Sequence, residues 1–389
     1  MTPAPPPEPL PGARLLFPLD PAVAYLNHGL VGVAPVAVLR AQQRLRDEME
    51  ANPARFFARG LRERVRHARQ HLAAALGADP DRSALVTNTT TGVAIVLASL
   101  RLGAGDEVLT TDHGHPGIAT AVRRATSTAG ARHVVVPTPL HADDDAIVHG
   151  LLDRIRAGRT RLAIVDMIAA PTARLFPVAR VASALRRVGV PLLVDGAHAP
   201  GALPLNVDEI GADFFAGNLH KWAYAPRGTA ILSVAAQWQP EMRALVVSMG
   251  DADGFPGSVE FAGTQDHTGQ LAAPTGWFVL RTLGPERVRA HNAALAAYGQ
   301  QVVGAALRLD PADLPDPGGP VPMRVVPLPV PEDTDPYGLR DRISDELGTE
   351  VAVNRWQDRL LLRLSAQVYN RPEEYERLAA GLPALLKSR

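Results

Sequence analysis

The stretch PLLVDGAH, residues 191–198, is an apolar strand that ends in an aspartate, with a histidine three residues further on. Between residues 84 and 235, short apolar runs of this kind alternate with amphipathic helical segments. The alternation predicts right-handed βαβ units around a mainly parallel sheet that helices cover on both faces. The apolar runs are Ala84–Val86, Glu107–Thr110, His133–Val136, Leu162–Val165, Pro191–Val194, Phe214–Phe215 and Gly228–Val234.

Asp195 and Lys221 form the chemical pair that the rest of the interpretation is built around. Ligands of open α/β sheets bind at the carboxyl ends of the strands, so Asp195 would lie at the site. Lys221, twenty-six residues later, is one of only two lysines among 40 basic residues. A lysine amine, unlike a guanidinium, can lose its proton and form a Schiff base. An aspartate that keeps a ring nitrogen protonated and a lysine that holds an aldehyde indicate pyridoxal 5'-phosphate (PLP), with Lys221 as the catalytic residue. The second lysine, Lys387, is expected to be a solvated tail residue.

The segment VTNTTTG, residues 86–92, is a strand-to-helix turn rich in hydroxyl groups. These hydroxyls, with the amides of the helix N-terminus, could hold a phosphate. Taken alone, a threonine run is more often a helix cap, and an Asp-x-x-His sequence is more often part of a loop. The order and spacing of all three features favour the joint interpretation.

The remaining segments predict four parts of the chain. Residues 1–20 are proline-rich and are expected to form a flexible arm. Residues 21–75, helical from 36 with a break at Asn52–Pro53, would pack on a small domain and at the entrance of the site. Residues 76–275 would form the large PLP-binding domain. Residues 276–389 would form the small domain, with a helix near 280–308, a break at 314–320, strands near 322–328, 350–355 and 360–365, and two further helices.

The composition excludes several classes of protein. The formal net charge is zero, which argues against a partner that is a nucleic acid or a membrane surface. With no cysteine, the chain has no disulfide, thiolate metal site or cysteine nucleophile, and we expect no metal. No signal peptide and no apolar run of ~18 residues is apparent, so we expect a cytoplasmic protein. A nucleotide-binding enzyme is disfavoured because neither glycine-rich phosphate motif is present.

Several motifs resemble one known family. Asp195–His198, Asn218–Lys221, Thr90–Gly92 and Arg363–Ser365 resemble the class V branch of fold-type I PLP enzymes. Within that branch the chain is similar to the isopenicillin N epimerase-like group, on Tyr25–Gly29, Asn52–Phe57, Thr111–His113 and Ala225–Gly228. The resemblance covers roughly residues 22–385. It implies a mainly parallel seven-stranded sheet covered by helices, with a smaller α+β C-terminal domain.

The resemblance also implies roles for individual side chains around the cofactor. His115 would stack on the cofactor ring, with His113 as the alternative, and His198 would donate to its phenolic oxygen. Thr264 would reach the phosphate of the neighbouring subunit, which implies a homodimer with shared active sites. The residues implied to hold the phosphate within one subunit are Thr90, Thr91, Asn218 and His220.

On the substrate side, Arg363 would clamp a carboxylate through its two-pronged fork. Asn27 and His28 belong to a segment that folds over the site entrance in relatives, and would contact the substrate. Residues 167–170, Met-Ile-Ala-Ala, stand where relatives often have histidine and hydroxyl residues, which predicts a wider or more apolar pocket.

The resemblance leaves several reactions at the α carbon of an amino acid open. The leading expectation is C–S lysis, or decarboxylation coupled to deamination, of a bulky amino-acid conjugate such as a cysteine S-conjugate, in specialised metabolism such as antibiotic biosynthesis. Epimerisation and transamination are alternatives, and a non-catalytic, cofactor-stabilised binding subunit is the alternative from another class. The absence of cysteine excludes cysteine desulfurase chemistry.

Overall fold

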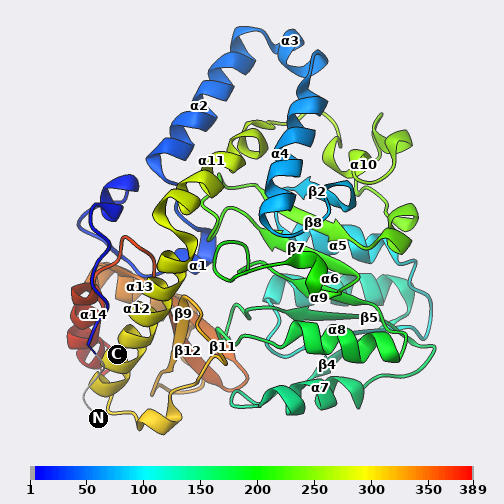
Figure 1. The fold of residues 1–389 in the computed structure, drawn as a ribbon. Helices are drawn as coiled ribbons and strands as arrows, with labels where there is room; N and C mark the ends of the chain where they lie inside the picture. The colour runs from blue at the N-terminus through cyan, green and yellow to red at the C-terminus, as the bar shows by residue number, and fades with distance from the viewer. Residues whose placement is uncertain (1–4, 388–389) are drawn as a thin grey trace.

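The computed structural model describes residues 5–387, and its central feature is a seven-stranded sheet of order β2-β8-β7-β6-β5-β3-β4 (Figure 1). β8 pairs antiparallel with both of its neighbours, and the other pairs are parallel. This confirms the predicted mainly parallel α/β fold. The strands are β2 (Ser83–Val86), β3 (Glu107–Thr111), β4 (Arg132–Val136), β5 (Thr160–Asp166), β6 (Leu192–Asp195), β7 (Phe214–Asn218) and β8 (Ala230–Val234).

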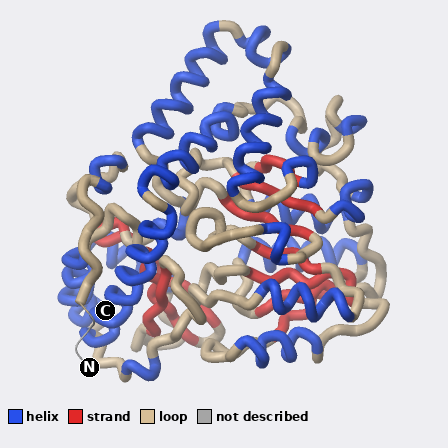
Figure 2. The backbone as a smooth tube through the Cα atoms, viewed as in Figure 1, coloured by secondary structure: helices blue, strands red, loops and turns tan. Residues whose placement is uncertain are grey.

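Helices lie on both faces of this sheet, as Figure 2 shows. Successive residues of a strand point to opposite faces, and β6 illustrates the result. Leu192 and Val194 join one apolar cluster, with α4 and α8, whereas Leu193 joins another, with α5 and α6. The helices around the sheet are α4 (Leu61–Ala75), α5 (Thr89–Ser99), α6 (Pro116–Ala129), α7 (Asp144–Leu152), α8 (Val178–Arg187) and α9 (Val207–Ile210).

The C-terminal part is built on a three-stranded antiparallel sheet of order β11-β12-β9. Its strands are β9 (Met323–Pro327), β11 (Ala352–Trp356) and β12 (Arg359–Ser365). The helices of this part are α12 (Pro285–Ala306), α13 (Pro336–Leu347) and α14 (Pro372–Leu385). The single helix expected near 280–308 is two, α11 (Thr268–Leu283) and α12, because Gly284 has a φ of 81° and Pro285 starts the second helix.

The N-terminal segment joins both parts. β1 (Ala24–Tyr25) pairs in parallel with β10 (Thr349–Glu350), and α2 and α4 pack on α11 (Figure 1). The helical run breaks at Asn52, as predicted, since the Asn52 side chain accepts the Arg55 N–H and Pro53 starts the next helix. The helices before α4 are α1 (His28–Val31), α2 (Val36–Ala51) and α3 (Pro53–Ala58). The division of the chain into four parts stays a prediction.

Residues 10–17 differ from the flexible arm that the composition predicts for residues 1–20, of which 1–4 lie outside the described residues. Leu10, Ala13 and Phe17 are buried around η1 (Ala13–Leu16). The Phe17 ring packs edge-on against Tyr224 and Tyr369, with centroids 5.3 and 5.0 Å away. Apolar burial therefore orders this segment despite its prolines.

The remaining described elements are short helical segments: η2 (Pro80–Arg82), η3 (Ala236–Glu241), η4 (Asp251–Asp253), α10 (Gly257–Glu260) and η5 (Pro311–Asp313). None of the helices within residues 5–387 combines the length and the apolar character that crossing a membrane requires.

Phe17→Ala is expected to lower the free energy of unfolding by about 3 kcal/mol, because it removes a buried ring and leaves a cavity beside two tyrosines. Urea unfolding followed by circular dichroism measures the change. Leu15→Ala is the matched control, since Leu15 is 86% exposed in the same turn. Equal, small effects of both substitutions would show that this segment is not packed in solution.

Candidate functional site

Three strands bring polar side chains to one edge of the sheet. Asp166 ends β5, Asp195 ends β6 and Asn218 ends β7. Asp166 and Asp195 are direct partners on adjacent parallel strands, so the two carboxyl groups lie side by side. Asp166 is an addition to the sequence-predicted set. Its signal was available, because it follows an apolar run in the same way as Asp195.

Two buried carboxyl groups this close cannot both ionise freely. Burial and the neighbouring charge of Asp195 raise the pKa of Asp166 well above its ordinary value. Burial also raises the pKa of Asp195, while the Ala197 N–H, which donates to Oδ1 at 2.9 Å, and Lys221 lower it. The pair therefore resists full ionisation, and the Ala197 N–H and Lys221 favour the charged form of Asp195.

Lys221 lies in the connection between β7 and β8, with its amine 3.2 Å from His198 Nε2. Burial, and next the charge of Arg363, lower the pKa of Lys221 to about 7, against the opposing effect of Asp195 and Asp166. A large fraction of the amine is therefore neutral, and nucleophilic, near neutral pH.

His198 presents a defined tautomer to Lys221. The indole N–H of Trp222 donates to His198 Nδ1 at 3.3 Å. The network thereby assigns the proton of the neutral ring to Nε2, which faces the lysine amine. Burial, and next the charge of Lys221, lower the pKa of His198 well below its ordinary value. His198 is thus a neutral N–H donor in the site.

The threonine-rich turn forms the start of α5. The Asn88 side chain caps the helix by accepting the Thr91 N–H at 2.8 Å, and Asn218 Oδ1 accepts the Thr89 N–H at 2.9 Å. Thr91 Oγ1 lies 2.8 Å from Thr87 Oγ1. Thr90 is exposed, and within residues 5–387 neither its N–H nor its hydroxyl has a recorded partner. The turn therefore offers unpaired donors at a helix N-terminus, as a phosphate requires.

The structure separates the two histidines considered for ring stacking. His113 is fully buried, with Nδ1 2.7 Å from Thr172 Oγ1 and Nε2 2.8 Å from the Thr138 carbonyl oxygen. His115 caps α6 and is solvent-accessible. Partial burial, then the charges of Lys221 and Arg363, lower the pKa of His115 to about 4, so it is a neutral ring beside them. This geometry favours His115.

Arg363, on β12, is buried close enough to Lys221 for its charge to lower the pKa of the amine. Its guanidinium donates to the Ala170 carbonyl oxygen at 2.7 Å and to Asn27 Oδ1 at 3.4 Å, while Nε has no partner. Asn27 is held in turn by donating to the Val351 carbonyl oxygen at 3.0 Å. Burial lowers the pKa of Arg363 to about 10, so it remains cationic at neutral pH. A buried cation with an unpaired N–H suits an anionic ligand.

His28 lies behind Lys221, where it does not line an open site. The ring is fully buried, with Nδ1 2.8 Å from the Tyr369 hydroxyl and Nε2 3.0 Å from the Lys221 carbonyl oxygen. Gly32 has a φ of 71°, and a Cβ there would lie 2.1 Å from the His220 carbonyl oxygen. The geometry favours a supporting role for His28, and its predicted contact with substrate stays untested.

The last two predicted residues are His220, in the connection between β7 and β8, and Thr264. His220 Nδ1 lies 3.0 Å from the Thr229 carbonyl oxygen, and burial lowers the pKa of His220 to about 4. Thr264 is exposed in the loop between α10 and α11. Within residues 5–387 the Thr264 side chain has no recorded hydrogen bond.

The donor set of this site fits PLP. Thr90 supplies unpaired phosphate donors, Asp195 a buried carboxylate for a ring nitrogen, and Lys221 an amine that is partly neutral. The orphaned guanidinium N–H of Arg363 fits the carboxylate of a bound substrate.

Residues 32–307 match the family model described as aminotransferase class V. The chain is 33% identical to an isopenicillin N epimerase of Amycolatopsis lactamdurans, over 96% of this chain and 98% of that protein. It is 30% identical to a putative L-cysteine desulfhydrase of Oryza sativa subsp. japonica, over 94% of this chain and 85% of that one.

The fold is also similar to that of a solved structure of a C-DES variant with glycine covalently linked to its PLP cofactor. The TM-score is 0.79 at 22% identity, and the match covers 95% of this chain and 98% of that one. At 22% identity, this similarity is evidence for the fold alone.

The rate at which apo-protein captures PLP covalently is expected to rise with pH and level off above about pH 8, because deprotonation of Lys221 is half complete at about 7. Stopped-flow absorbance between about pH 5.5 and 9 measures the rate. A model lysine peptide, with an ordinary amine, should keep accelerating over this range.

Lys221→Ala should abolish the adduct that borohydride traps, whereas Lys387→Ala should leave it intact. A rate that climbs steadily to pH 9 would contradict the lowered pKa.

Proposed function

Because the chain belongs to the class V aminotransferase family of PLP-dependent enzymes, we propose that it cleaves the C–S bond of a cysteine S-conjugate. The observation that carries the proposal is a group of three buried side chains. The Lys221 amine has a pKa lowered to about 7, and it lies with the cation Arg363 and the carboxyl group of Asp195. The relatives named as L-cysteine desulfhydrases support this class of substrate. Decarboxylation coupled to deamination of such a conjugate is kept as a variant; it is a two-electron oxidation and would require an external oxidant such as dioxygen as co-substrate.

When bound, PLP withdraws electrons from the α carbon of an amino-acid amine attached to it. Asp195, whose charged form the Ala197 N–H and Lys221 favour, would hold the ring nitrogen in its protonated form. Thr90 and Thr91, with Asn218 and His220 beside them, would hold the phosphate. His198 Nε2–H would donate to the phenolic oxygen, and His115 would cover a ring face.

Lys221 is the group we assign to proton transfer at the α carbon. An effective acid–base group has a pKa near the working pH, and that of Lys221 is lowered to about 7. The pKa values of His115 and His220 are lowered further, to about 4, so these rings stay neutral. Among these basic side chains, Lys221 would thus carry the proton, whereas the neutral histidines would serve as hydrogen-bond donors.

Arg363 is the group we assign to the substrate carboxylate. The Ala170 carbonyl oxygen and Asn27 orient the guanidinium from one side, and its Nε–H remains unpaired. By holding the carboxylate, Arg363 would determine which bond at the α carbon is oriented for cleavage. The reaction is redox-neutral: a cysteine conjugate and water give the free thiol, pyruvate and ammonia.

The apolar segment after β5 would form the wall for the thiol side of the substrate. Ile168, Ala169 and Ala170 are buried and carry no side-chain donor or acceptor. A sulfur substituent leaves this wall with no unmet hydrogen bond, whereas a polar substituent would be desolvated without compensation. This favours a bulky, apolar conjugate.

Epimerisation is the second candidate, because a relative with 33% identity is an isopenicillin N epimerase. It requires a second proton carrier on the opposite side of the α carbon. The histidines around Lys221 have pKa values lowered to about 4 or well below their ordinary value, so they serve poorly as that carrier at neutral pH. Lysis therefore comes first, ahead of transamination and of a non-catalytic binding role.

We also propose a homodimer in which Thr264 contributes to the neighbouring site. Thr264 is exposed, and the nearby segment Leu245–Met249 is apolar and exposed, with Val247 at 79% and Met249 at 95%. Contiguous exposed apolar side chains of this kind favour a protein interface. Placement in the cytoplasm and a role in antibiotic biosynthesis are likewise proposals.

Incubation with a panel of cysteine S-conjugates and free amino acids should give a thiol and pyruvate from the conjugates, identified by mass spectrometry. Loss of carbon dioxide would indicate the decarboxylating variant. A product that differs from the substrate only in chirality would identify an epimerase and contradict lysis. Lys221→Ala is the control for cofactor reactivity in solution.

Arg363→Lys should lower kcat/KM for a cysteine conjugate, because a lysine cannot provide a planar fork. The expected loss of transition-state stabilisation is ~1.5–3 kcal/mol. The absorbance spectrum of the resting holoenzyme should not change. A decarboxylated amine analogue, which has nothing to clamp, should be processed as well by the variant as by the wild type. Equal losses for amine and amino acid would mean that Arg363 is structural.

A further inference from the structure

The backbone of Leu85, in β2, forms hydrogen bonds with side chains that lie outside the sheet. β2 lies at an edge of the sheet, with β8 as its one neighbour. On the outer side, the Leu85 N–H donates to Glu260 Oε1 at 2.9 Å. The Leu85 carbonyl oxygen accepts a longer bond, 3.5 Å, from Gln270 Nε2. Two side chains therefore occupy the positions that a further strand would take.

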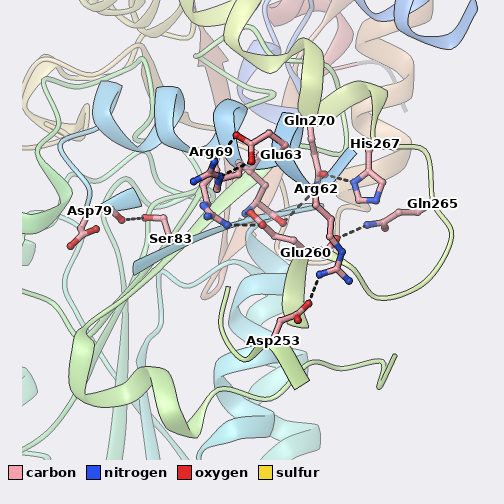
Figure 3. Close-up of polar contacts among 12 residues, drawn as sticks. Arg62, Glu63, Arg69, Asp79, Ser83, Asp253, Glu260, Gln265, His267 and Gln270 are labelled. Carbon is pink, nitrogen blue, oxygen red and sulfur yellow. Dashed lines mark hydrogen bonds and ion pairs between the residues drawn. The ribbon is translucent and has the colours of Figure 1, made fainter. Parts of the chain in front are cut away.

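Glu260 is fixed on its other side by a buried cation. Its Oε2 lies 2.7 Å from the guanidinium of Arg69 on α4, and both side chains are less than a tenth exposed (Figure 3). Burial raises the pKa of Glu260 to about 7, against the lowering effect of Arg69. A buried ion pair is weak evidence for net stability, since apolar side chains of similar size often serve as well. Its geometry, in contrast, is specific.

The residues bonded to Leu85 stand at the two ends of one loop. Glu260 is the last residue of α10, Gln270 lies in the first turn of α11, and residues 261–267 connect them. The Gln265 side chain donates to the Glu260 carbonyl oxygen at 3.1 Å, and His267 Nδ1 lies 2.8 Å from Gln270 Oε1 (Figure 3). The loop is thus held at both ends to a single residue of β2.

This loop and the threonine-rich turn are both connected to β2. Leu85 is two residues before Thr87, where β2 passes into the turn, and Thr264 lies in the loop. A cavity of about 150 Å³ separates the two segments, and its lining includes Thr87, Thr91 and Gln265. A displacement of the loop ends would therefore act on the same strand that sets the position of the turn.

We propose that Glu260 and Gln270 are positioning residues: with Leu85 they form a clamp that sets where Thr264 stands relative to the threonine-rich turn of its own subunit. This proposal rests on the proposed function, in which Thr264 contacts the phosphate of the neighbouring subunit. Under that arrangement the clamp links two cofactor sites. The strand that shapes the phosphate turn of one subunit also positions the donor for the other.

Two variants remove the clamp without leaving a lone buried charge. The double variant Arg69→Met with Glu260→Leu replaces the ion pair by apolar side chains, and Gln270→Met removes the second contact. Asp253→Asn is the matched control, because it breaks the exposed Arg62–Asp253 pair between α4 and the segment before α10 (Figure 3). Circular dichroism establishes that each variant is folded.

The first measurement is amide hydrogen exchange of the holoenzyme. Both clamp variants should exchange about tenfold faster in residues 261–267 and 87–91, and the control should not. Unchanged exchange in residues 261–267 would overturn the clamp. This readout does not depend on any contact of Thr264 with a cofactor.

The second measurement is a double-mutant cycle on the dissociation constant of PLP. Each clamp variant should weaken PLP binding about tenfold when Thr264 is present, and less than about twofold further in a Thr264→Ala background. Additive losses would show that the clamp does not act through Thr264. If Thr264→Ala alone bound PLP as the wild type does, the proposed contact of Thr264 would fail and the link between sites with it. The exchange result would still decide whether the clamp exists.

Discussion

The burial of the Lys221 amine beside Arg363 is the constraint on which the rest of the site depends. Two cations in a dry environment each disfavour the charge of the other, and the lysine responds because its amine can give up a proton. Arg363 keeps its charge and is compensated by the Ala170 carbonyl oxygen and Asn27. The carboxyl pair at the ends of β5 and β6 limits the shift of the lysine, since one carboxylate remains ionised close by. The site thus combines a buried cation, a pair of buried carboxyl groups and an amine whose pKa is lowered to about 7.

Segments distant in sequence keep the amine in this position. His28 forms a hydrogen bond with the Lys221 carbonyl oxygen, and the backbone of Gly32 approaches His220 and Lys221 so closely that a side chain there would clash. Behind His28 stand Tyr369 and Phe17. Side chains from residues 10–32 therefore pack behind the segment that carries Lys221. Order in these residues comes from apolar burial, which explains why a proline-rich composition misleads about their mobility.

Under the proposed function, the cofactor phosphate and the substrate carboxylate would be held by parts of the fold that belong to different sheets. The threonine-rich turn belongs to the large sheet, at the junction of β2 with α5, whereas Arg363 comes from the three-stranded C-terminal sheet. Asn218 and Asn88 fix the turn by accepting backbone N–H groups of α5. On the side of the edge strand, Glu260 and Gln270 take the place of a neighbouring strand. Under the proposed function, each polar end of the ligand would therefore meet an element of regular structure, as selective cleavage at one carbon requires.

The sequence by itself determined the sheet and its chemistry-bearing ends. Each of the seven apolar runs became a strand, and Asp195 and Lys221 could be proposed as site residues because strand ends and a rare lysine are local signals. Only the tertiary structure distinguished His113 from His115, because two histidines in one turn look alike until one is seen fully paired. It also decided the partners of His28, Asp166 and Glu260, since contacts between elements far apart in the chain leave no periodicity in the sequence. Local propensity specifies elements, whereas burial and pKa arise from what folding brings together.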